Sequence, residues 1–441
     1  MAFFTPADAH KASATTLPVN DAAIEGIWST KKLRTLFGLV MLTSVNSLAI
    51  SFFSPGIPQI AEELKLSSTG MSLTIIAFLF PLGASQLGHG PLSDHFGRKR
   101  VLNLALGASL AGCIACALAT NQIEFIAARI AWGLGGGGIA VCARALLREQ
   151  FGGVQLNKAV STLIFGAAVV SMLAPAFGGF LIQTRAWRIA FVIQSIYVAL
   201  VWAGFALWFP MAKTRNVKRL QWSRACKIYR AVLANSTFRI GMSGVMCAYA
   251  IEVLCLSMSP SVFQVRLGVG PESYGMILIF PVVAEVFGNF AAALLDRHGS
   301  TLRPAAVGAV FILAAGACLL SLESLSGLTV LSAVAAIAAA MFGAGLVFAE
   351  CTAESLRPFM RTAGTSAALA GLLQHLGAGA VVLVLSSTNA RSGPSLGGGF
   401  LVCGLGVIVT SFMMWRHPRT AMARTAGRSN RGVQTGEGFD A

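Results

Sequence analysis

Long apolar stretches separated by short polar segments dominate this sequence. Each stretch is about 20 residues long, the length that an α-helix needs to cross the hydrocarbon core of a bilayer. Because a helix satisfies its own backbone hydrogen bonds, the pattern predicts an all-α membrane protein with twelve transmembrane helices. The stretches cover residues 35–55, 71–92, 101–119, 125–146, 159–181, 189–209, 240–262, 273–294, 305–322, 328–349, 362–388 and 397–415.

The gap at 210–239 divides the spans into two groups of six. We therefore expect two pseudo-symmetric six-helix bundles, at 35–209 and 240–415, joined by this segment. Its Lys and Arg residues have no acidic residue among them. Two interpretations of the linker stay open: a basic amphipathic stretch on the anionic cytoplasmic leaflet, or a solvated linker held inside by its charge.

The basic residues predict the orientation. Most of the 33 Lys and Arg residues lie in segments on the side of the N-terminus, and five lie on the other side: Lys65, Arg185, Arg188, Arg266 and Arg391. By the positive-inside rule, 1–34 and 416–441 are expected to be cytoplasmic tails. The first stretch is longer than a signal-peptide core, so we expect it to stay as the first span. The expected location is a bacterial inner membrane.

Composition excludes several other classes of protein. Only 11% of the 441 residues are charged, whereas a soluble domain carries about 25%. The net charge of +16 follows the loops rather than one folded face, which argues against nucleic-acid binding. The nine cysteines lie mostly in apolar stretches, so neither a disulfide framework nor a metal site is expected. No catalytic cluster or cofactor motif appears in the loops. We expect a monomer, surrounded by lipid, that is not an enzyme.

The loop after the second span carries the most specific motif. It runs from Gly90 through Asp94, Gly97, Arg98 and Lys99 to residue 100. We expect Gly90 to let the span approach a neighbouring helix closely and Gly97 to permit a very short turn. Asp94 should pair with Arg98 or a helix N-terminus, because an unpaired carboxylate facing lipid is costly.

This loop resembles the signature loop of the major facilitator superfamily, whose pattern is G-x-L-x-D-x-x-G-R-K/R. The resemblance implies a latch that holds the two halves together on the cytoplasmic side. Between spans 8 and 9, Asp296 and Arg297 belong to a second Asp-x-x-Gly turn at the matching place. The repeat favours duplication of a six-span unit.

Two further motifs resemble those of the superfamily. Arg129 and Gly133 in span 4 resemble its R-x-x-Q-G motif, with Trp132 in place of Gln. In span 5, a run containing Pro175, Gly178 and Gly179 resembles the antiporter motif G-P-x-x-G-G, with Ala in place of the first Gly; it lies at 174–179.

Span 11, with Gly371 and Gln374, and the segment 54–58 resemble the bicyclomycin and chloramphenicol resistance branch of the drug:proton antiporters. The resemblance implies proton-coupled efflux of small lipophilic or amphipathic compounds by alternating access. Export of one endogenous metabolite, such as a siderophore, and proton-coupled nutrient uptake are the alternatives. The branch usually has an Asp shortly before the first proline of span 1, whereas this chain has Ser51. A coupling carboxylate must therefore lie elsewhere.

Charged residues inside the spans are the candidates for proton coupling or the substrate cavity. Glu285 and Glu252 lie mid-span, where an ion costs about 2.5–3.5 kcal/mol and so usually faces a cavity. Glu350 lies near the end of span 10, and Arg129 is a cation without a nearby carboxylate in sequence. For each acid, a structural carboxyl bonded to a neighbouring helix is the alternative. His375, next to Gln374, is expected to be packed or hydrogen-bonded rather than titrating.

Overall fold

The computed structural model describes residues 29–151, 153–183, 187–207, 222–297, 303–325, 327–388 and 396–416. Every element in these ranges is a helix. Twelve helical segments are long and apolar enough to cross a membrane, which confirms the predicted number of spans. Most of the two expected tails, and residues 210–221 of the expected linker, lie outside the described residues.

The first half contains the helices α1 (Thr30–Ser51), α2 (Ile57–Glu63), α3 (Ser68–Phe96), α4 (Arg98–Leu118), α5 (Gln122–Gln150), α6 (Gly153–Ile182) and α7 (Trp187–Leu207), with the short helix η3 (Ser54–Gly56) between α1 and α2. The second half contains α9 (Ser236–Pro260), η4 (Ser261–Arg266), α10 (Pro271–Ile277), α11 (Ile279–Arg297), α12 (Pro304–Ser324), α13 (Val330–Leu356), η5 (Arg357–Thr362), α14 (Ala363–Thr388) and α15 (Leu396–Arg416). The helix α8 (Trp222–Ala234) lies between the halves in sequence.

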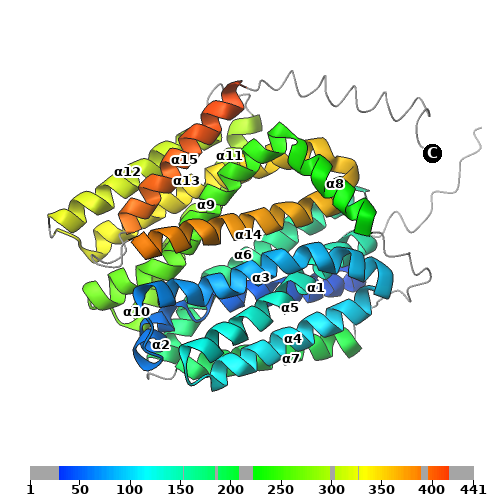
Figure 1. Cartoon of the computed structure of the whole chain (residues 1–441), viewed down its shortest axis with the longest axis horizontal. Helices are drawn as coiled ribbons and strands as arrows, with labels where there is room; N and C mark the ends of the chain where they lie inside the picture. The colour runs from blue at the N-terminus through cyan, green and yellow to red at the C-terminus, as the bar shows by residue number, and fades with distance from the viewer. Residues whose placement is uncertain are drawn as a thin grey trace, which may run out of the picture.

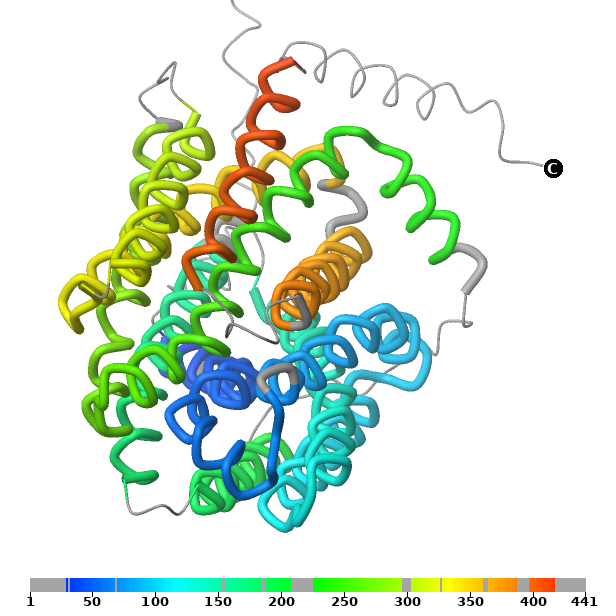
Figure 2. The backbone as a smooth tube through the Cα atoms, turned by 60° about the vertical axis from the view of Figure 1, so that its left-hand side comes forward, coloured from blue at the N-terminus to red at the C-terminus, as the bar shows by residue number. Residues whose placement is uncertain are grey.

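Corresponding helices pack in the same way in the two halves. In the first half α5 packs against α3 and α4, and in the second half α13 packs against α11 and α12. Glycine residues, which have no side chain, allow these close approaches. Gly133 of α5 lies against the Phe78 carbonyl of α3, and Gly288 of α11 lies against the Phe342 carbonyl of α13. The two halves meet where α3 and α14 run side by side through the middle of the molecule (Figures 1 and 2).

Local sequence accounts for where several helices begin. Ser67, Asn121 and Asn235 cap α3, α5 and α9, because each side chain accepts a hydrogen bond from a backbone N–H of the first turn. Thr329 and Ser332 form a capping box at the start of α13. These caps satisfy backbone donors that the first turn of a helix leaves unpaired.

Span boundaries differ from the sequence prediction mainly where helices are broken. Span 1 continues past residue 55 through η3 and α2 to Glu63, because Pro55 and Pro58 each fall in the first turn of a new helix. Span 7 continues past Pro260 into η4, a π-helical segment. Pro281 lies in the first turn of α11, just after the break between α10 and α11 at Leu278.

Part of the expected linker is a helix. In α8, Val232 is buried, whereas Lys227 and Arg230 are exposed. The Tyr229 hydroxyl donates a hydrogen bond to the Leu87 carbonyl of α3 at 3.4 Å, and burial raises the pKa of Tyr229. In Figure 1, α8 lies at one end of the molecule, which we name the α8 end, and α2 and α10 lie at the opposite end, named the α2 end.

Candidate functional site

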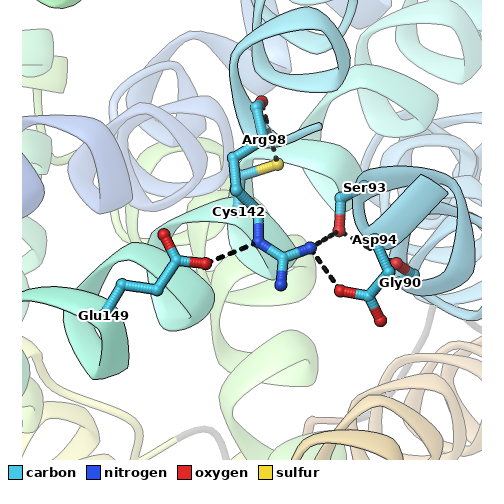
Figure 3. A network of polar contacts seen from close by, with 6 residues as sticks. All are labelled: Gly90, Ser93, Asp94, Arg98, Cys142 and Glu149. Atoms are coloured by element: carbon cyan, nitrogen blue, oxygen red, sulfur yellow. Dashed lines mark hydrogen bonds and ion pairs between the residues drawn. The ribbon is translucent and has the colours of Figure 1, made fainter. Parts of the chain in front are cut away.

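Arg98, at the start of α4, is the centre of a polar network at the α8 end (Figure 3). Its guanidinium contacts the Asp94 carboxylate at 2.5 Å, the Ser93 hydroxyl at 2.7 Å and the Glu149 carboxylate at 3.0 Å. Cys142 of α5 donates to the Arg98 carbonyl at 3.9 Å. The recorded partners all belong to the first half, so this Arg98 network joins α3, α4 and α5 to one another.

The two glycines of the signature loop differ in what they do. Gly97 separates α3 from α4 with a φ of 89°, a conformation that residues with a Cβ atom rarely adopt. The expectation for Gly90 is wrong, because a Cβ added there would meet no atom within 4 Å. The Gly90 carbonyl instead accepts a hydrogen bond from the Ser93 hydroxyl at 2.9 Å. Lys99 is exposed.

The second half has a related contact at the α8 end, built on Glu350. This carboxylate accepts a hydrogen bond from the Ala305 backbone N–H at 2.8 Å and lies 3.8 Å from the Arg303 guanidinium. Glu350 thus holds the N-terminus of α12, where a negative charge is favoured by the helix dipole. The side chains of Asp296 and Arg297, the residues predicted for this position, lie outside the described residues.

Arg129 is sealed inside the first half. Its side chain is 0% exposed and donates hydrogen bonds of 2.8 Å to the Ala49 carbonyl of α1 and the Thr74 carbonyl of α3. The rings of Phe53, Phe78 and Trp132 lie 4.5, 4.9 and 5.3 Å from its guanidinium carbon. Carbonyl dipoles and aromatic faces together stabilise a cation that is removed from water. These contacts join Arg129 of α5 to α1 and α3.

Glu252 and Glu285 both lie in the interior of long helices and are half-buried. Among the described residues, neither carboxylate has a basic partner within ion-pair distance. The two groups are close enough to interact electrostatically with each other and with Tyr249. Gly345 of α13 lies against the Glu285 carbonyl, so α11 and α13 pack closely at this residue.

His375 of α14 continues this polar region toward the first half. Its Nδ1 atom lies 2.5 Å from the Gly371 carbonyl, and its ring packs edge-on against Tyr249 with centroids 5.2 Å apart. A packed and hydrogen-bonded histidine is what the sequence favoured. Gln374 is half-buried and makes no hydrogen bond to any residue in the described ranges.

The antiporter-like motif of span 5 lies at the α2 end, against both halves. Gly178 packs directly against the Phe52 carbonyl of the first half, and Gly179 packs directly against the Pro271 carbonyl of the second half. The contact is reciprocal, because Gly275 of α10 meets the Pro175 carbonyl. A Cβ atom on any of these glycines would collide with backbone. We name this close packing of α6 on α10 the glycine seam.

Hydrogen bonds between the halves lie beside the glycine seam. The Ser54 hydroxyl of η3 donates to the Leu256 carbonyl of α9 at 3.1 Å. The Tyr274 hydroxyl lies 2.7 Å from the Ser259 hydroxyl and 3.5 Å from that of Ser54. Gln264 donates to the Pro55 carbonyl at 2.9 Å. Polar groups and close backbone contacts therefore hold the halves together at the α2 end.

Sequence reasoning missed several residues of these clusters. Glu149 is an acid at the end of a span, on the side of the membrane where most Lys and Arg residues lie, which is a usable signal for an ion pair. Tyr274 is one of only four tyrosines in an apolar chain, and a buried tyrosine needs a partner for its hydroxyl. Gln264 has no comparable signal, since it acquires its contact only through packing between the halves.

Comparison with known proteins agrees with these observations. The profile of the Major Facilitator Superfamily matches residues 39–382. The chain belongs to this family. It is therefore a secondary transporter and not an enzyme. Its twelve spans and half-to-half packing agree with that assignment.

Several curated relatives are drug-resistance proteins of bacteria. Multidrug resistance protein D of Escherichia coli is 28% identical over 86% of this chain and 93% of its own length. The multidrug transporter MdfA of Yersinia pestis is 26% identical over 77% of this chain and 83% of its own length. The chloramphenicol resistance protein of Pseudomonas aeruginosa is 25% identical, over 78% and 81% respectively.

Solved structures share the fold. The crystal structure of a D-xylose–proton symporter superposes with a TM-score of 0.68 at 17% identity and covers 86% of this chain and 97% of that one. A bacterial homologue of the human lysosomal transporter Spinster gives a TM-score of 0.65 at 15% identity, over 91% and 98%. No potential metal-binding group of three or more His, Cys, Asp or Glu residues occurs among the described residues.

Proposed function

We propose that the protein exports small lipophilic or amphipathic compounds in exchange for protons, by alternating access. The observation that carries the proposal is the pair Glu252 and Glu285. These carboxyl groups lie mid-span, are partly accessible, and have no basic partner in the described part of the chain. A carboxyl group in such a place can take up and release a proton, and intramembrane acids usually mark ion or proton pathways.

The orientation follows from the basic residues. The α8 end, with the Arg98 network, is in the cytoplasm, and the α2 end faces the periplasm of a bacterial inner membrane. In this arrangement the chain has its outer side closed by the glycine seam and by the hydrogen bonds of Ser54 to Leu256 and Tyr274. Substrate enters from the cytoplasm or the inner leaflet, and opening of the seam releases it outside.

Coupling rests on the interaction between the two carboxyl groups. A carboxylate on one raises the cost of ionising the other, because like charges repel in a medium of low dielectric. We expect substrate that binds beside these carboxyl groups to compete with protons for this region. Glu285 is the first choice as proton carrier, because α11 begins anew just before it at the break near Pro281. Glu350 is assigned to holding α12, and Arg129 to joining α1, α3 and α5.

Transport in inside-out membrane vesicles tests the proposal. With an imposed proton gradient, wild-type vesicles should accumulate a fluorescent lipophilic dye, and Glu285→Gln vesicles should lose uphill accumulation while still binding the dye. Gln has a similar shape to Glu but carries no titrating proton. Glu62→Gln, at an exposed acid of α2, is the matched control and should transport normally. Accumulation only in right-side-out vesicles would instead indicate uptake and overturn the proposal of export.

A further inference from the structure

Arg144 is a second cation inside the first half, and its surroundings differ from those of Arg129. It lies in α5, is half-buried, and its Nη2 atom donates to the Gln86 side-chain oxygen at 2.8 Å. Within the described ranges this is its one hydrogen bond, and no carboxylate lies within ion-pair distance. A guanidinium has five N–H donors in a planar fork, so most of the donors of Arg144 are left for another partner.

The partner of Arg144 lies at the boundary between the halves. Gln86 of α3 is 1% exposed, and its side-chain oxygen lies 2.5 Å from where a Cβ atom of Gly371 would be. The absence of a side chain at Gly371, in α14, therefore makes room for this amide. The Gly371 carbonyl is also the atom that His375 Nδ1 contacts. A Cβ atom added to Gly83 of α3 would lie 3.1 Å from the Cβ atom of His375, so α3 and α14 pack closely here.

A second cation lies near Arg144. Among the described residues, the charged group that interacts with it electrostatically is Arg148, and no carboxylate lies within ion-pair distance. A membrane-embedded cation is costly unless an anion or several acceptors compensate it. Arg129 has two carbonyls and three aromatic rings. Arg144 has one amide oxygen, so the protein alone leaves it undercompensated.

We propose that Arg144 and Gln86 form a subsite for an oxyanion, and that this oxyanion is a carboxylate carried by the transported compound. The planar guanidinium fork matches a carboxylate in geometry and charge. Through His375 and Tyr249, the subsite leads to Glu252 and Glu285 in the second half. This row of side chains thus has a basic end at Arg144 and an acidic end at Glu252 and Glu285, which suits an amphipathic acid or a zwitterion. The proposal rests on the proposed function, since it places substrate between the halves.

Binding to the purified full-length protein in phosphatidylcholine nanodiscs tests the subsite without any proton gradient. The probes are tetramethylrhodamine, which has a free carboxylate, and its methyl ester, which does not. Arg144→Gln should weaken binding of the free acid about tenfold or more, because it removes a charge-assisted contact. The ester should bind with less than about a twofold change. Arg144→Lys keeps the charge but loses the planar fork, so its affinity for the free acid should lie between those of wild type and Arg144→Gln.

Controls separate the subsite from general effects of charge and folding. Arg239→Gln removes an exposed cation at the start of α9 and should change neither affinity. Equal loss of acid and ester binding in Arg144→Gln, or no loss of either, would overturn the proposal, as would a wild type that binds the two probes equally. Because the assay needs no transport, a failure of Glu285-dependent coupling would leave its result unaffected.

A lipid headgroup is the other source of an oxyanion. The same measurements are therefore repeated in nanodiscs that contain phosphatidylglycerol. Unchanged discrimination between acid and ester supports a substrate carboxylate. If phosphatidylglycerol abolishes binding of the acid to wild type, or stabilises wild type but not Arg144→Gln against heat while neither probe binds, the site belongs to lipid and the substrate assignment is wrong.

Discussion

Gly179→Ala tests whether the glycine seam closes the α2 end. The Cβ atom of the alanine would collide with the Pro271 carbonyl and would also lie 3.2 Å from the Glu272 Cα atom. Both obstacles belong to backbone, so no side-chain rotation relieves the collision. The helices α6 and α10 must separate for the methyl group to fit, whereas an open seam accommodates it without cost.

The size of the effect follows from this difference between the two states. Inserting one carbon into a well-packed interface typically costs about 1–3 kcal/mol. Because the cost falls only on the closed seam, it shifts the equilibrium toward the open state by about 5- to 150-fold. Gly204→Ala is the matched control, since a Cβ atom there meets nothing within 4 Å and α7 keeps its packing.

Electron–electron distance measurements between spin labels at positions 62 and 272 report the opening. Glu62 of α2 and Glu272 of α10 are exposed and belong to different halves. Cys226 and Cys318, the exposed cysteines, are replaced first. Gly179→Ala should move the distance distribution toward longer values, and Gly204→Ala should leave it as in wild type. An unchanged distribution in a folded Gly179→Ala protein would refute the reasoning.

Three further outcomes are expected. Asp94→Asn should leave membrane insertion intact and lower the transport rate about fivefold, since a partly exposed ion pair contributes about 1 kcal/mol; wild-type rates would show that the Arg98 network has no role in the cycle. Arg129→Met should lower the free energy of unfolding by about 2–4 kcal/mol, because two buried carbonyls lose their donors; thermal unfolding of purified protein measures this, and an unchanged stability contradicts it. Tyr274→Phe should raise the population of the open seam about fivefold in the same spin-label experiment, by loss of its hydrogen bond to Ser54 across the halves, worth about 1 kcal/mol; a closed distribution argues against a gating role.

The twelve spans could be predicted because the need to bury apolar helices in lipid acts on each segment separately. The short turn at Gly97 could be anticipated for a similar reason, since backbone conformation is a local property. Breaks within spans were harder to predict. Pro55 looks like a stop signal in the sequence, yet it begins a new helical turn and span 1 continues to Glu63.

Contacts between spans could not be predicted from one sequence. Gly90 was expected to pack closely and has open space beside it, whereas Gly371 provides the room that Gln86 occupies. Glu350 and Glu285 are both candidates for a functional role in the sequence, but only the fold shows that one binds the N-terminus of α12 and the other has no basic partner among described residues. Such differences depend on which helices become neighbours.

Proton release on substrate binding tests the central claim most directly. Purified wild-type protein, in weakly buffered solution with a pH-sensitive dye, should release protons when a transported compound is added. The released amount should fall in Glu285→Gln and should stay at the wild-type level in the Glu62→Gln control. If Glu285→Gln releases protons like wild type, Glu285 is not the coupling group, and if wild type releases none, substrate and protons do not compete for this site.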